Sequence, residues 1–337
     1  GREIELKLLV ESGSIDDLLK RLEAAASTFS AQVPQLLESR YFDTADRRLR
    51  AHGASLRVRR IGDRFIQTLK TRSEEGGAHT VRGEWENDVA SMAPDLAAVV
   101  DATALERLGK VLPEELEFVF ATRVERRLVL VEQPVPGAPP AIIEVAFDKG
   151  DIVVGGDGAD GAGTRDGRSE AISEVELELK AGPTHGLYHL LGDLRTWAPV
   201  QVAVGSKAER GYRAADGTVP DATRATNPAL DPEMTVGEAL CEILHNCLAQ
   251  WLANIAAARD GRDIEGVHQL RIAVRRSRSA LSLFTEAIGR DQRLAWNDRL
   301  KSVIAATGSA RQLDVFLSET VPAVATGLAA EDMPGLE

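Results

Sequence analysis

The first residues of the chain alternate charged and aliphatic side chains. Glu3, Glu5 and Lys7 are each followed by an aliphatic residue. Successive side chains of a β-strand point to opposite faces, so these three charges would share one face. Carboxylates are ligands for hard divalent cations, and lysine is a partner for phosphate oxygens. The chemistry to look for is therefore the binding of phosphate together with metal ions.

This charged alternation recurs along the chain. The later charged positions are Arg57 and Arg59; Arg82, Glu84 and Glu86; Glu144 and Asp148; and Glu174, Glu176, Glu178 and Lys180. A sheet with one wet face also alternates, but it would mix charges of scattered sign with Ser, Thr and Gln. If the strands close on themselves, the charges meet in a lumen, where bare charge is unstable without partners. The pattern predicts a tunnel in which basic residues hold a polyanion and carboxylates hold divalent cations.

Basic residues that could bind a chain of phosphates are Lys7, Arg57, Arg59, Lys70, Arg123, Arg126 and Lys207. Arginine offers a planar fork to phosphate oxygens, whereas lysine acts as a point charge. Arg123 and Arg126 would point to opposite faces of a regular strand, although a bulge could bring both inside. Glu84 and Glu86 share the inward face, and the choice between them stays open.

Several short motifs follow one another along the chain. They are Glu3-x-Glu5-x-Lys7, Tyr41-Phe42-Asp43-Thr44, Leu56-Arg57-Val58-Arg59, Thr68-Leu69-Lys70, Arg82-Gly83-Glu84-Trp85-Glu86, Glu174 to Lys180, and Ser206-Lys207. As a set they resemble the CYTH superfamily, the triphosphate tunnel metalloenzymes, over residues 1–213. The resemblance implies a roughly eight-stranded antiparallel β-tunnel that hydrolyses or cyclises triphosphates with Mg²⁺ or Mn²⁺.

The same resemblance implies roles for individual residues. It places metal binding on Glu3, Glu5, Glu86, Asp148, Glu176 and Glu178. It places triphosphate binding on Lys7, Arg57, Arg59, Lys70, Arg126 and Lys207. We expect Glu5, Glu176 and Lys70 to be catalytic, Glu174 to lie at the tunnel mouth or in solvent, and Lys180 to lie on the surface.

Hydrophobic periodicity divides the chain into two regions. Strands are expected in the first eight residues and at 36–42, 55–61, 64–71, 79–89, 118–132, 141–149, 172–180 and 200–206, with helices at 15–26, 96–111 and 185–196. Residues 214–235 have no period and are typical of a linker. Residues 236–337 show only helical spacing. The expected fold class is α+β, an antiparallel tunnel with flanking helices, followed by an all-α bundle segment.

A helix expected at residues 267–284 carries a basic face. His268, Arg271, Arg275 and Arg278 share it, and no acidic residue interrupts the helix. The run from His268 to Arg276, with Arg311 to Phe316, resembles the CHAD domain, a helical module often fused to CYTH domains. This resemblance implies polyphosphate binding through His268, Arg271, Arg275, Arg278, Lys301 and Arg311. Since residues 236–337 are fewer than a full CHAD domain, we expect an incomplete one.

Composition limits the function classes. A hydrophobic fraction of 44% and a charged fraction of 27% are typical of soluble globular proteins. The net charge of −12 argues against a general nucleic-acid binder. The sequence has no apolar run long enough to cross a bilayer, and we expect no signal peptide. Cys241 and Cys247 are expected to be small core residues in a reducing cytosol. We therefore expect a cytoplasmic protein without nucleic-acid or membrane partners.

The leading functional hypothesis is a metal-dependent inorganic triphosphatase that hydrolyses tripolyphosphate to pyrophosphate and phosphate. It is favoured because the charged residues include no evident element for recognising a base. A nucleotide triphosphatase or a class IV adenylate cyclase is an alternative, since the same tunnel can serve either. Another alternative is a non-catalytic polyphosphate-binding adaptor, in which the tunnel is a receptor and the helical region a targeting module.

Overall fold

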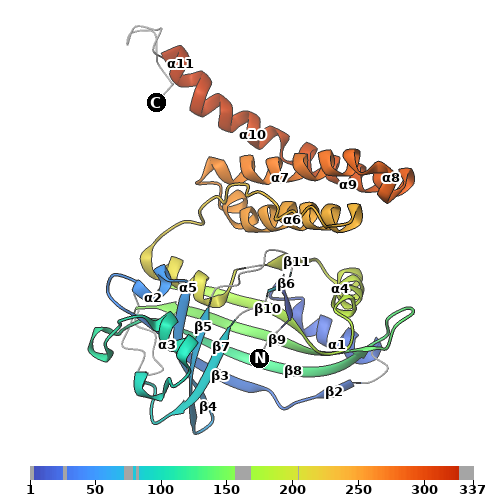
Figure 1. The fold of residues 1–337 in the computed structure, drawn as a ribbon. Helices are drawn as coiled ribbons and strands as arrows, with labels where there is room; N and C mark the ends of the chain where they lie inside the picture. The colour runs from blue at the N-terminus through green and yellow to red at the C-terminus, as the bar shows by residue number, and fades with distance from the viewer. Residues whose placement is uncertain are drawn as a thin grey trace. The chain divides into compact units, whose positions relative to one another are not determined.

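The computed structural model describes residues 4–25, 29–71, 79–80, 83–155, 168–203 and 205–325. The chain forms two compact units, residues 1–218 and 219–337, which are described separately below (Figure 1). The first is an antiparallel sheet with flanking helices and the second is helical, which confirms the expected fold class. No described helix combines the length and the apolar character that crossing a lipid bilayer requires.

The first unit is built on one sheet, whose main path runs β11-β1-β10-β9-β8-β3-β4-β5-β7. Its strands are β1 (Glu5–Val10), β3 (Gln35–Asp43), β4 (Ala54–Ile61), β5 (Arg64–Thr71), β7 (Glu84–Val89), β8 (Glu117–Gln133), β9 (Ala141–Val154), β10 (Arg168–Ala181) and β11 (Val200–Ala203). Two short strands pair off this path, β2 (Phe29–Ala31) with β8 and β6 (His79–Thr80) with β1. The long strands β8, β9 and β10 lie side by side (Figure 1).

The implied count of eight strands is wrong, because nine strands form the main path within the described residues. The short β11 brings the number to nine. It pairs with Lys7 to Val10 of β1. Backbone groups on that edge of β1 would otherwise lack partners, which is the usual reason for a short covering strand.

The two ends of the path approach each other through β6. Glu5 and Leu6 of β1 pair with Thr80 and His79 of β6. Thr80 stands four residues before the start of β7, and an extended chain of four residues spans at most about 14 Å. The start of β7 therefore lies near β1, at the opposite end of the path, as a curled sheet requires.

The expected helix at residues 96–111 is also wrong. In its place are a 3₁₀ turn, η1 (Leu96–Ala98), and a short helix, α3 (Ala102–Leu108). Asp95 accepts a hydrogen bond from a backbone N–H of η1, and Asp101 accepts two from α3. Because each piece has its own N-cap residue, the backbone is turned between them instead of continuing as one helix.

The sheet's outer face at β4 and β5 packs on η1 and α3. Leu56 and Leu69 belong to this core, as do Val99 and Leu108, and Trp85 packs against it, turned away from the inner face. The other helices of the unit are α1 (Ile15–Ala25), α2 (Arg48–Ala51), η2 (Pro113–Glu115), α4 (His185–Trp197) and α5 (Lys207–Asp216). α1 and α4 contact each other and β10.

Helix α5 is absent from the sequence-based expectations, and it covers one end of the inner face. Ser206 and Glu209 form a capping box at its start. Tyr212 packs edge-on against Phe120, with ring centroids 5.4 Å apart. An added Cβ at Gly211 would lie 2.0 Å from the Phe120 ring. The close approach of α5 to the sheet therefore depends on glycine at this position.

The second unit is helical in every described element. It contains α6 (Val236–Asp260), α7 (Ile264–Leu283), α8 (Thr285–Ile288), α9 (Arg290–Ala306), α10 (Gly308–Val315), the π-helical turn η3 (Phe316–Thr320) and α11 (Val321–Ala325). A capping box of Thr235 and Glu238 starts α6, and Gly261 ends it with a φ of 78°. Cys247 is buried as expected, whereas Cys241 is exposed, so the expectation of two core cysteines is wrong.

Polar side chains join α6 to α7 and to the segment before α6. Arg276 donates to Gln250 and Asn246 of α6 and to the carbonyl of Thr226. The fully buried Asn254 bonds both backbone polar groups of Thr223. Residues 223–226, which lie within the expected linker, are therefore attached to α6 and α7.

Gly211→Ala should lower the free energy of unfolding by about 1–3 kcal/mol. The added Cβ overlaps the Phe120 ring, and this overpacking outweighs the helix-propensity gain of about 1 kcal/mol. Gly192→Ala in α4 is the matched control, since no atom lies within 4 Å of its added Cβ. It should raise the free energy of unfolding by about 0.5–1 kcal/mol. Urea denaturation measures both, and equal effects would contradict the packing described for α5.

Candidate functional site

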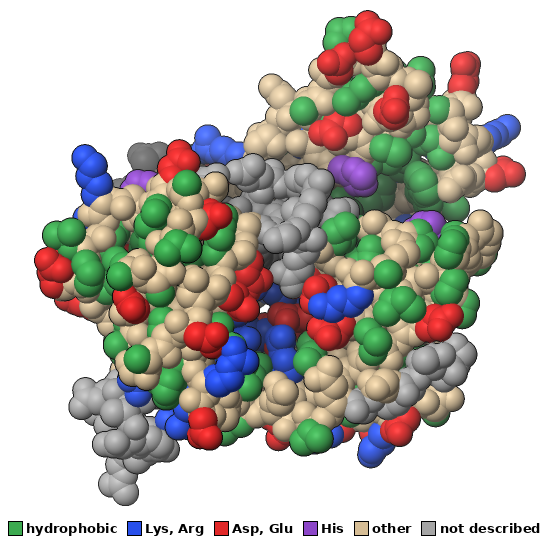
Figure 2. Space-filling view, turned by 60° about the horizontal axis from the view of Figure 1, so that its bottom comes forward, with side chains coloured by type: hydrophobic (Ala, Val, Ile, Leu, Met, Phe, Trp, Pro, Cys, Tyr) green, Lys and Arg blue, Asp and Glu red, His purple; other side chains and the backbone are tan. Residues whose placement is uncertain are grey.

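A pocket of about 200 Å³ lies on the inner face of the sheet. Figure 2 shows a hollow with acidic and basic side chains inside it. The charged residues that line the pocket are Lys7, Arg57, Arg59, Lys70, Arg126, Lys207, Glu5, Glu84, Glu86, Glu144, Glu176 and Glu178. Charges from strands far apart in the sequence therefore converge on one cavity.

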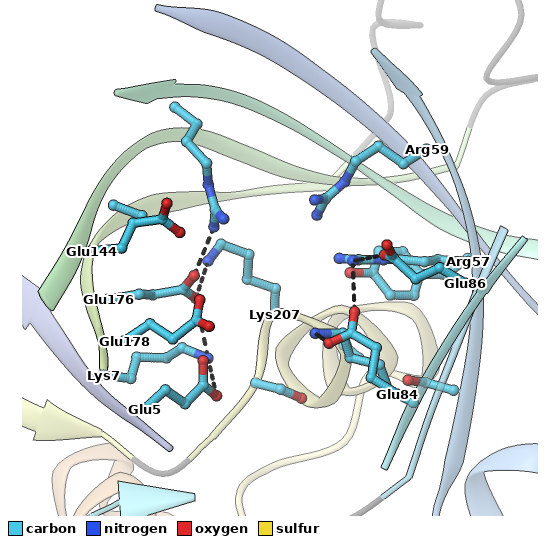
Figure 3. Close-up of a pocket in the computed structure, with 17 residues that line it drawn as sticks. Glu5, Lys7, Arg57, Arg59, Glu84, Glu86, Glu144, Glu176, Glu178 and Lys207 are labelled. Atoms are coloured by element: carbon cyan, nitrogen blue, oxygen red, sulfur yellow. Dashed lines mark hydrogen bonds and ion pairs between the residues drawn. The ribbon is translucent and has the colours of Figure 1, made fainter. Parts of the chain in front are cut away.

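The two walls of the pocket differ in character (Figure 3). Glu144, Glu176 and Glu178 lie close together on one side, with Glu5 and Lys7 beside them. Strand register explains this grouping, because Glu5 is paired with Glu178 and Lys7 with Glu176. We call this side, formed by β1, β9 and β10, the acidic wall.

The opposite side is the basic wall, formed by β4, β5 and β7. Arg57 and Arg59 of β4 project from it, together with Glu84 and Glu86 of β7. Lys70 of β5 also lines the pocket. The Lys70 ammonium lies 2.8 Å from Glu84, and the Arg57 guanidinium lies 3.7 Å from Glu84 and 3.9 Å from Glu86. Both Glu84 and Glu86 line the pocket, so the structure does not select one of them as the inward residue.

Beside the acidic wall, Arg126 and Lys207 line the pocket and make ion pairs with Asp148, Glu174 and Glu176. Arg126 donates two hydrogen bonds to Asp148, at 2.8 and 2.6 Å, and one to Glu176 at 2.7 Å. The Lys207 ammonium lies 2.8 Å from Asp148, 2.6 Å from Glu174 and 2.9 Å from Glu176. Asp148 and Glu174 are fully buried, so each depends on these partners for its charge to be tolerated.

The ion pairs reverse the effect of burial on the pKa values. Burial alone would raise the pKa values of Asp148 and Glu176. Lys207 and Arg126 outweigh it, so the pKa of Asp148 is lowered and that of Glu176 lies well below its ordinary value. Burial would likewise lower the pKa values of Lys207 and Arg126, but Glu176 and Asp148 raise both. All four groups are therefore charged at neutral pH.

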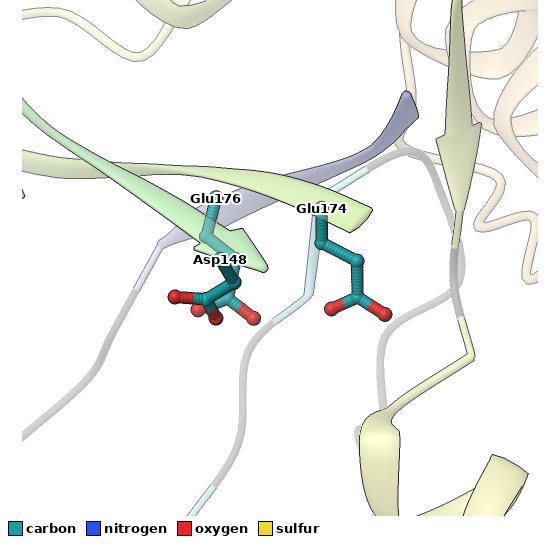
Figure 4. A group of neighbouring side chains, drawn as sticks. All are labelled: Asp148, Glu174 and Glu176. Atoms are coloured by element: carbon teal, nitrogen blue, oxygen red, sulfur yellow. The ribbon is translucent and has the colours of Figure 1, made fainter. Parts of the chain in front are cut away.

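Asp148, Glu174 and Glu176 form an acidic cluster whose oxygens lie within 4.8 Å of one another (Figure 4). Glu174 was expected at the tunnel mouth or in solvent, and that expectation is wrong because the residue is fully buried. Lys207 contacts all three carboxylates. Asp148 and Glu174 do not line the pocket. Asp148 instead holds Arg126 and Lys207 in place, and Glu174 holds Lys207.

The two arginines of the basic wall are half-buried and only weakly compensated by carboxylates. Arg59 donates to the hydroxyl of Ser39 at 3.1 Å. Burial, with Arg57 and Arg126 nearby, lowers the pKa of Arg59 to about 9. The Nε of Arg57 is buried and has no hydrogen-bond partner among the described residues. Such groups are stabilised when an anion enters, which makes this wall suitable for phosphate.

Tyr41 lines the pocket between these groups. Its ring stacks on Phe120 with centroids 4.4 Å apart. Burial would raise the pKa of Tyr41, but Arg57 and Arg59 outweigh it and lower the value. The hydroxyl therefore lies in a field of positive potential, which also favours an anion in the pocket.

Three residues of the sequence-based set are not placed in the pocket, and one of them is Asp148. Glu3 lies outside the described residues. Arg123 does not line the pocket, and its Nε lies 4.0 Å from Glu38. The register of β8 with β9 is regular from Ala121 to Gln133, so no bulge there turns Arg123 toward Arg126. Of the two arginines left open, Arg126 is the inward one.

Sequence reasoning placed Glu144 on the charged face without a role, and it did not single out Arg210. Glu144 alternates with Asp148 on the same strand face and lines the pocket, so the strand pattern contained its signal. Lys180 is exposed, as expected, and approaches Glu144 at 3.2 Å and Glu178 at 2.6 Å. Arg210 contacts Glu174, but its position depends on α5, which the strand pattern did not indicate.

Glu5, Glu144, Glu176 and Glu178 offer the donors that suit a divalent cation. They are hard oxygen ligands from adjacent strands and they face the pocket. Glu86 faces the pocket from the opposite wall. Asp148 is less suited, since it is fully buried and bound by Arg126 and Lys207.

In the helical unit, the basic residues singled out from the sequence lie on α7, α9 and α10. Arg275 is exposed. Arg271 donates to the carbonyl of Ile304 and to Thr307, and Arg278 donates to Asn297. Lys301 lies 3.1 Å from Asp298, while His268 and Arg311 are half-buried. Two of these arginines therefore also join α7 to α9.

Known proteins resemble both parts of the chain. Residues 1–212 match the CYTH domain and residues 242–337 match the CHAD domain. An inorganic triphosphatase of Haemophilus influenzae is 29% identical over 213 residues, which cover 63% of this chain and 54% of that protein. The chain thus spans about half the length of the curated relative it matches.

Two solved structures are more distant. A Hippeastrum protein, described as a candidate adenylyl cyclase with a dominant triphosphatase activity, is 18% identical with a TM-score of 0.43, covering 64% of this chain and 97% of its own. A Bacillus halodurans protein, described as a candidate adenylate cyclase, is 19% identical with a TM-score of 0.40, covering 62% of this chain and 96% of its own. Scores this low add nothing to the sequence match.

The order of the motifs, the curled antiparallel sheet and the domain match agree over the first unit. The CYTH match covers more than half of the chain. The chain therefore belongs to the CYTH domain family and carries a CHAD domain in its helical unit.

Proposed function

We propose that the first unit is a metal-dependent inorganic triphosphatase, which converts tripolyphosphate and water to pyrophosphate and phosphate. The observation that carries the proposal is the basic wall, where half-buried Arg57 and Arg59 face a pocket without full compensation by carboxylates. The relative from Haemophilus influenzae, named as an inorganic triphosphatase, supports the same activity.

The size and lining of the pocket favour an inorganic substrate. Its volume of about 200 Å³ is small for a ligand site. Tyr41 is the one aromatic residue among the described residues that line it, and its ring is already stacked on Phe120. A purine base would therefore find no free aromatic face in the described lining.

The basic residues divide the work of holding the phosphate chain. Arg57, Arg59 and Lys70 would bind it from the basic wall and Lys7 from the acidic wall. Arg126 of β8 and Lys207 of α5 would bind it from beside the acidic wall. Fixed cations stabilise negative charge that develops in the transition state, because they need not reorganise. Lys70, held beside Glu84 at 2.8 Å, is our candidate for the cation closest to the reacting phosphate.

Glu5, Glu176 and Glu178 are the proposed metal ligands, with Glu144 as a further candidate. A divalent cation, Mg²⁺ or Mn²⁺, would there neutralise phosphate charge and make a bound water more acidic. Glu176 suits this role because its lowered pKa keeps it ionised well into the acidic range.

For the helical unit we propose binding of long-chain inorganic polyphosphate. His268, Arg271, Arg275 and Arg278 of α7 would line the site, with Lys301 of α9 and Arg311 of α10. A run of cations without intervening acidic residues attracts a polyanion, and the attraction weakens with added salt.

Glu176→Gln and Glu5→Gln should each reduce Mg²⁺-dependent phosphate release from tripolyphosphate by at least about a hundredfold, because each removes a proposed metal ligand. Phosphate release measures the rate, and circular dichroism tests the fold. Glu125→Gln, an exposed residue of β8, is the control and should retain full activity. Undiminished turnover in the Glu176 and Glu5 variants would remove this mechanism. Production of cyclic AMP from ATP, or binding without phosphate release, would favour the alternatives.

Arg126→Gln and Arg123→Gln form a matched pair on one strand. Arg126→Gln should abolish most tripolyphosphate hydrolysis, because it removes a cation of the pocket and leaves buried Asp148 poorly compensated. Arg123→Gln should leave kcat and KM nearly unchanged, since Arg123 does not line the pocket. Steady-state kinetics with tripolyphosphate test the pair, and similar losses in both variants would contradict the assignment.

Arg275→Gln and Arg276→Gln separate binding from folding in the helical unit. Arg275 is exposed, so its loss should weaken polyphosphate binding several-fold without changing the melting temperature. Arg276 joins α6 to α7, so its loss should lower the melting temperature by several degrees. Fluorescence titration with long-chain polyphosphate and thermal unfolding measure the two effects. Unchanged affinity in the Arg275 variant would argue against a site on this face.

A further inference from the structure

Lys207 is held by more negative charge than its role as a phosphate ligand would favour. Its ammonium lies within 3 Å of Asp148, Glu174 and Glu176. Three carboxylates around one ammonium would draw it behind the acidic wall and offset the charge it offers to a substrate. Something else must compensate part of this negative charge if Lys207 is to face the pocket.

Arg210 is that compensating group. It stands three residues after Lys207 on α5, so the two side chains lie on the same side of the helix. Its Nη1 lies 2.5 Å from one oxygen of Glu174, while Lys207 lies 2.6 Å from the other. The fully buried Glu174 thus bridges the two cations.

The position of Arg210 is fixed by further contacts. Its Nε donates to Glu170 at 2.7 Å and its Nη2 donates to the carbonyl of Ala171 at 2.5 Å. All three acceptors belong to β10, and Arg210 does not line the pocket. The planar guanidinium therefore fastens the first turns of α5 to the strand that carries Glu176.

Counting charges shows what Arg210 contributes. Asp148, Glu174 and Glu176 are paired with Arg126, Lys207 and Arg210, while Lys7 also pairs with Glu176 and Arg210 also pairs with Glu170. Without Arg210, the cation paired with Glu174 among the described residues would be Lys207 alone. Lys207 would then be bound more tightly by Glu174, and less of its positive potential would reach the pocket.

We propose that Arg210 and Glu174 are a positioning pair, which directs Lys207 at the pocket and leaves its charge available to the substrate's phosphate. Neither residue touches the substrate, so both act through Lys207. The inference rests on the proposed function of this pocket, since it assumes that Lys207 binds a phosphate group.

Calorimetric titration with tripolyphosphate, in the presence of a chelator so that no turnover occurs, tests the pair. Arg210→Gln should weaken binding by about tenfold, the effect of one charge-assisted contact. Arg210→Lys keeps the charge but loses the planar fork, so it should recover part of the affinity and weaken binding only about threefold. If Arg210→Gln does not fold, the Arg210→Lys variant still gives a measurable shift.

A double-mutant cycle shows whether Arg210 acts through Lys207. In a Lys207→Gln background, adding Arg210→Gln should change the dissociation constant by less than about twofold, because the residue through which it acts is gone. Independent losses that multiply would overturn the proposal. So would an Arg210→Gln protein that binds as tightly as the wild type.

Asp216→Asn is the matched control for loosening α5. Asp216 accepts hydrogen bonds from Arg47 and Arg50, and so anchors the far end of the helix. This variant should lower the melting temperature but leave the affinity for tripolyphosphate unchanged. Equal loss of affinity in Asp216→Asn and Arg210→Gln would mean that Arg210 only stabilises the helix, which overturns the proposal.

Hydrolysis is measured separately with Mg²⁺ or Mn²⁺. A wild-type protein that binds tripolyphosphate but does not cleave it would refute the proposed activity, while the titrations would still decide the role of Arg210. A wild-type protein that binds no tripolyphosphate would overturn both.

Discussion

The compensation of buried charge is the constraint on which the first unit depends. Asp148 and Glu174 are fully buried inside the sheet, and a buried carboxylate that loses its partner costs about 3–5 kcal/mol. The partners come from different elements, Arg126 from β8 and Lys207 and Arg210 from α5. The ion pairs that arrange the pocket can form only when the sheet has curled and α5 has docked on it. The fold and the site therefore form together.

Charge compensation differs between the two walls of the pocket, and this difference determines which ligands the pocket favours. The carboxylates behind the acidic wall are matched by cations at 2.6–2.9 Å. On the basic wall, Arg59 has the neutral Ser39 hydroxyl as its partner and Arg57 has a buried Nε without one. Positive potential therefore remains inside a cavity whose carboxylates can still hold a cation. An anion with several negative charges, together with a metal ion, restores the balance that the protein alone leaves incomplete.

Strand alternation predicted much of the first unit, because a period of two assigns each charge to a face regardless of distant contacts. It brought Glu5, Lys7 and Glu176 to one surface as expected. It failed for Glu174, because burial depends on α5, and the strand pattern gives no signal of a helix that covers one end of the sheet. It could not choose between Arg123 and Arg126, since that choice depends on whether the register with β9 contains a bulge. The helix at 96–111 failed because Asp95 and Asp101 each start a separate helical piece.

Helix α5 also determines where the tunnel unit can be divided. The last strand of the sheet ends at Ala203, before α5 begins. A polypeptide cut there would retain every described strand. It would lack Lys207, the Arg210 guanidinium that pairs with Glu174, and the Tyr212 ring that packs on Phe120. The minimal independent domain is therefore longer than its β-structure. Any gene fusion or circular permutation of this unit has to keep the segment through Asp216 joined to the sheet.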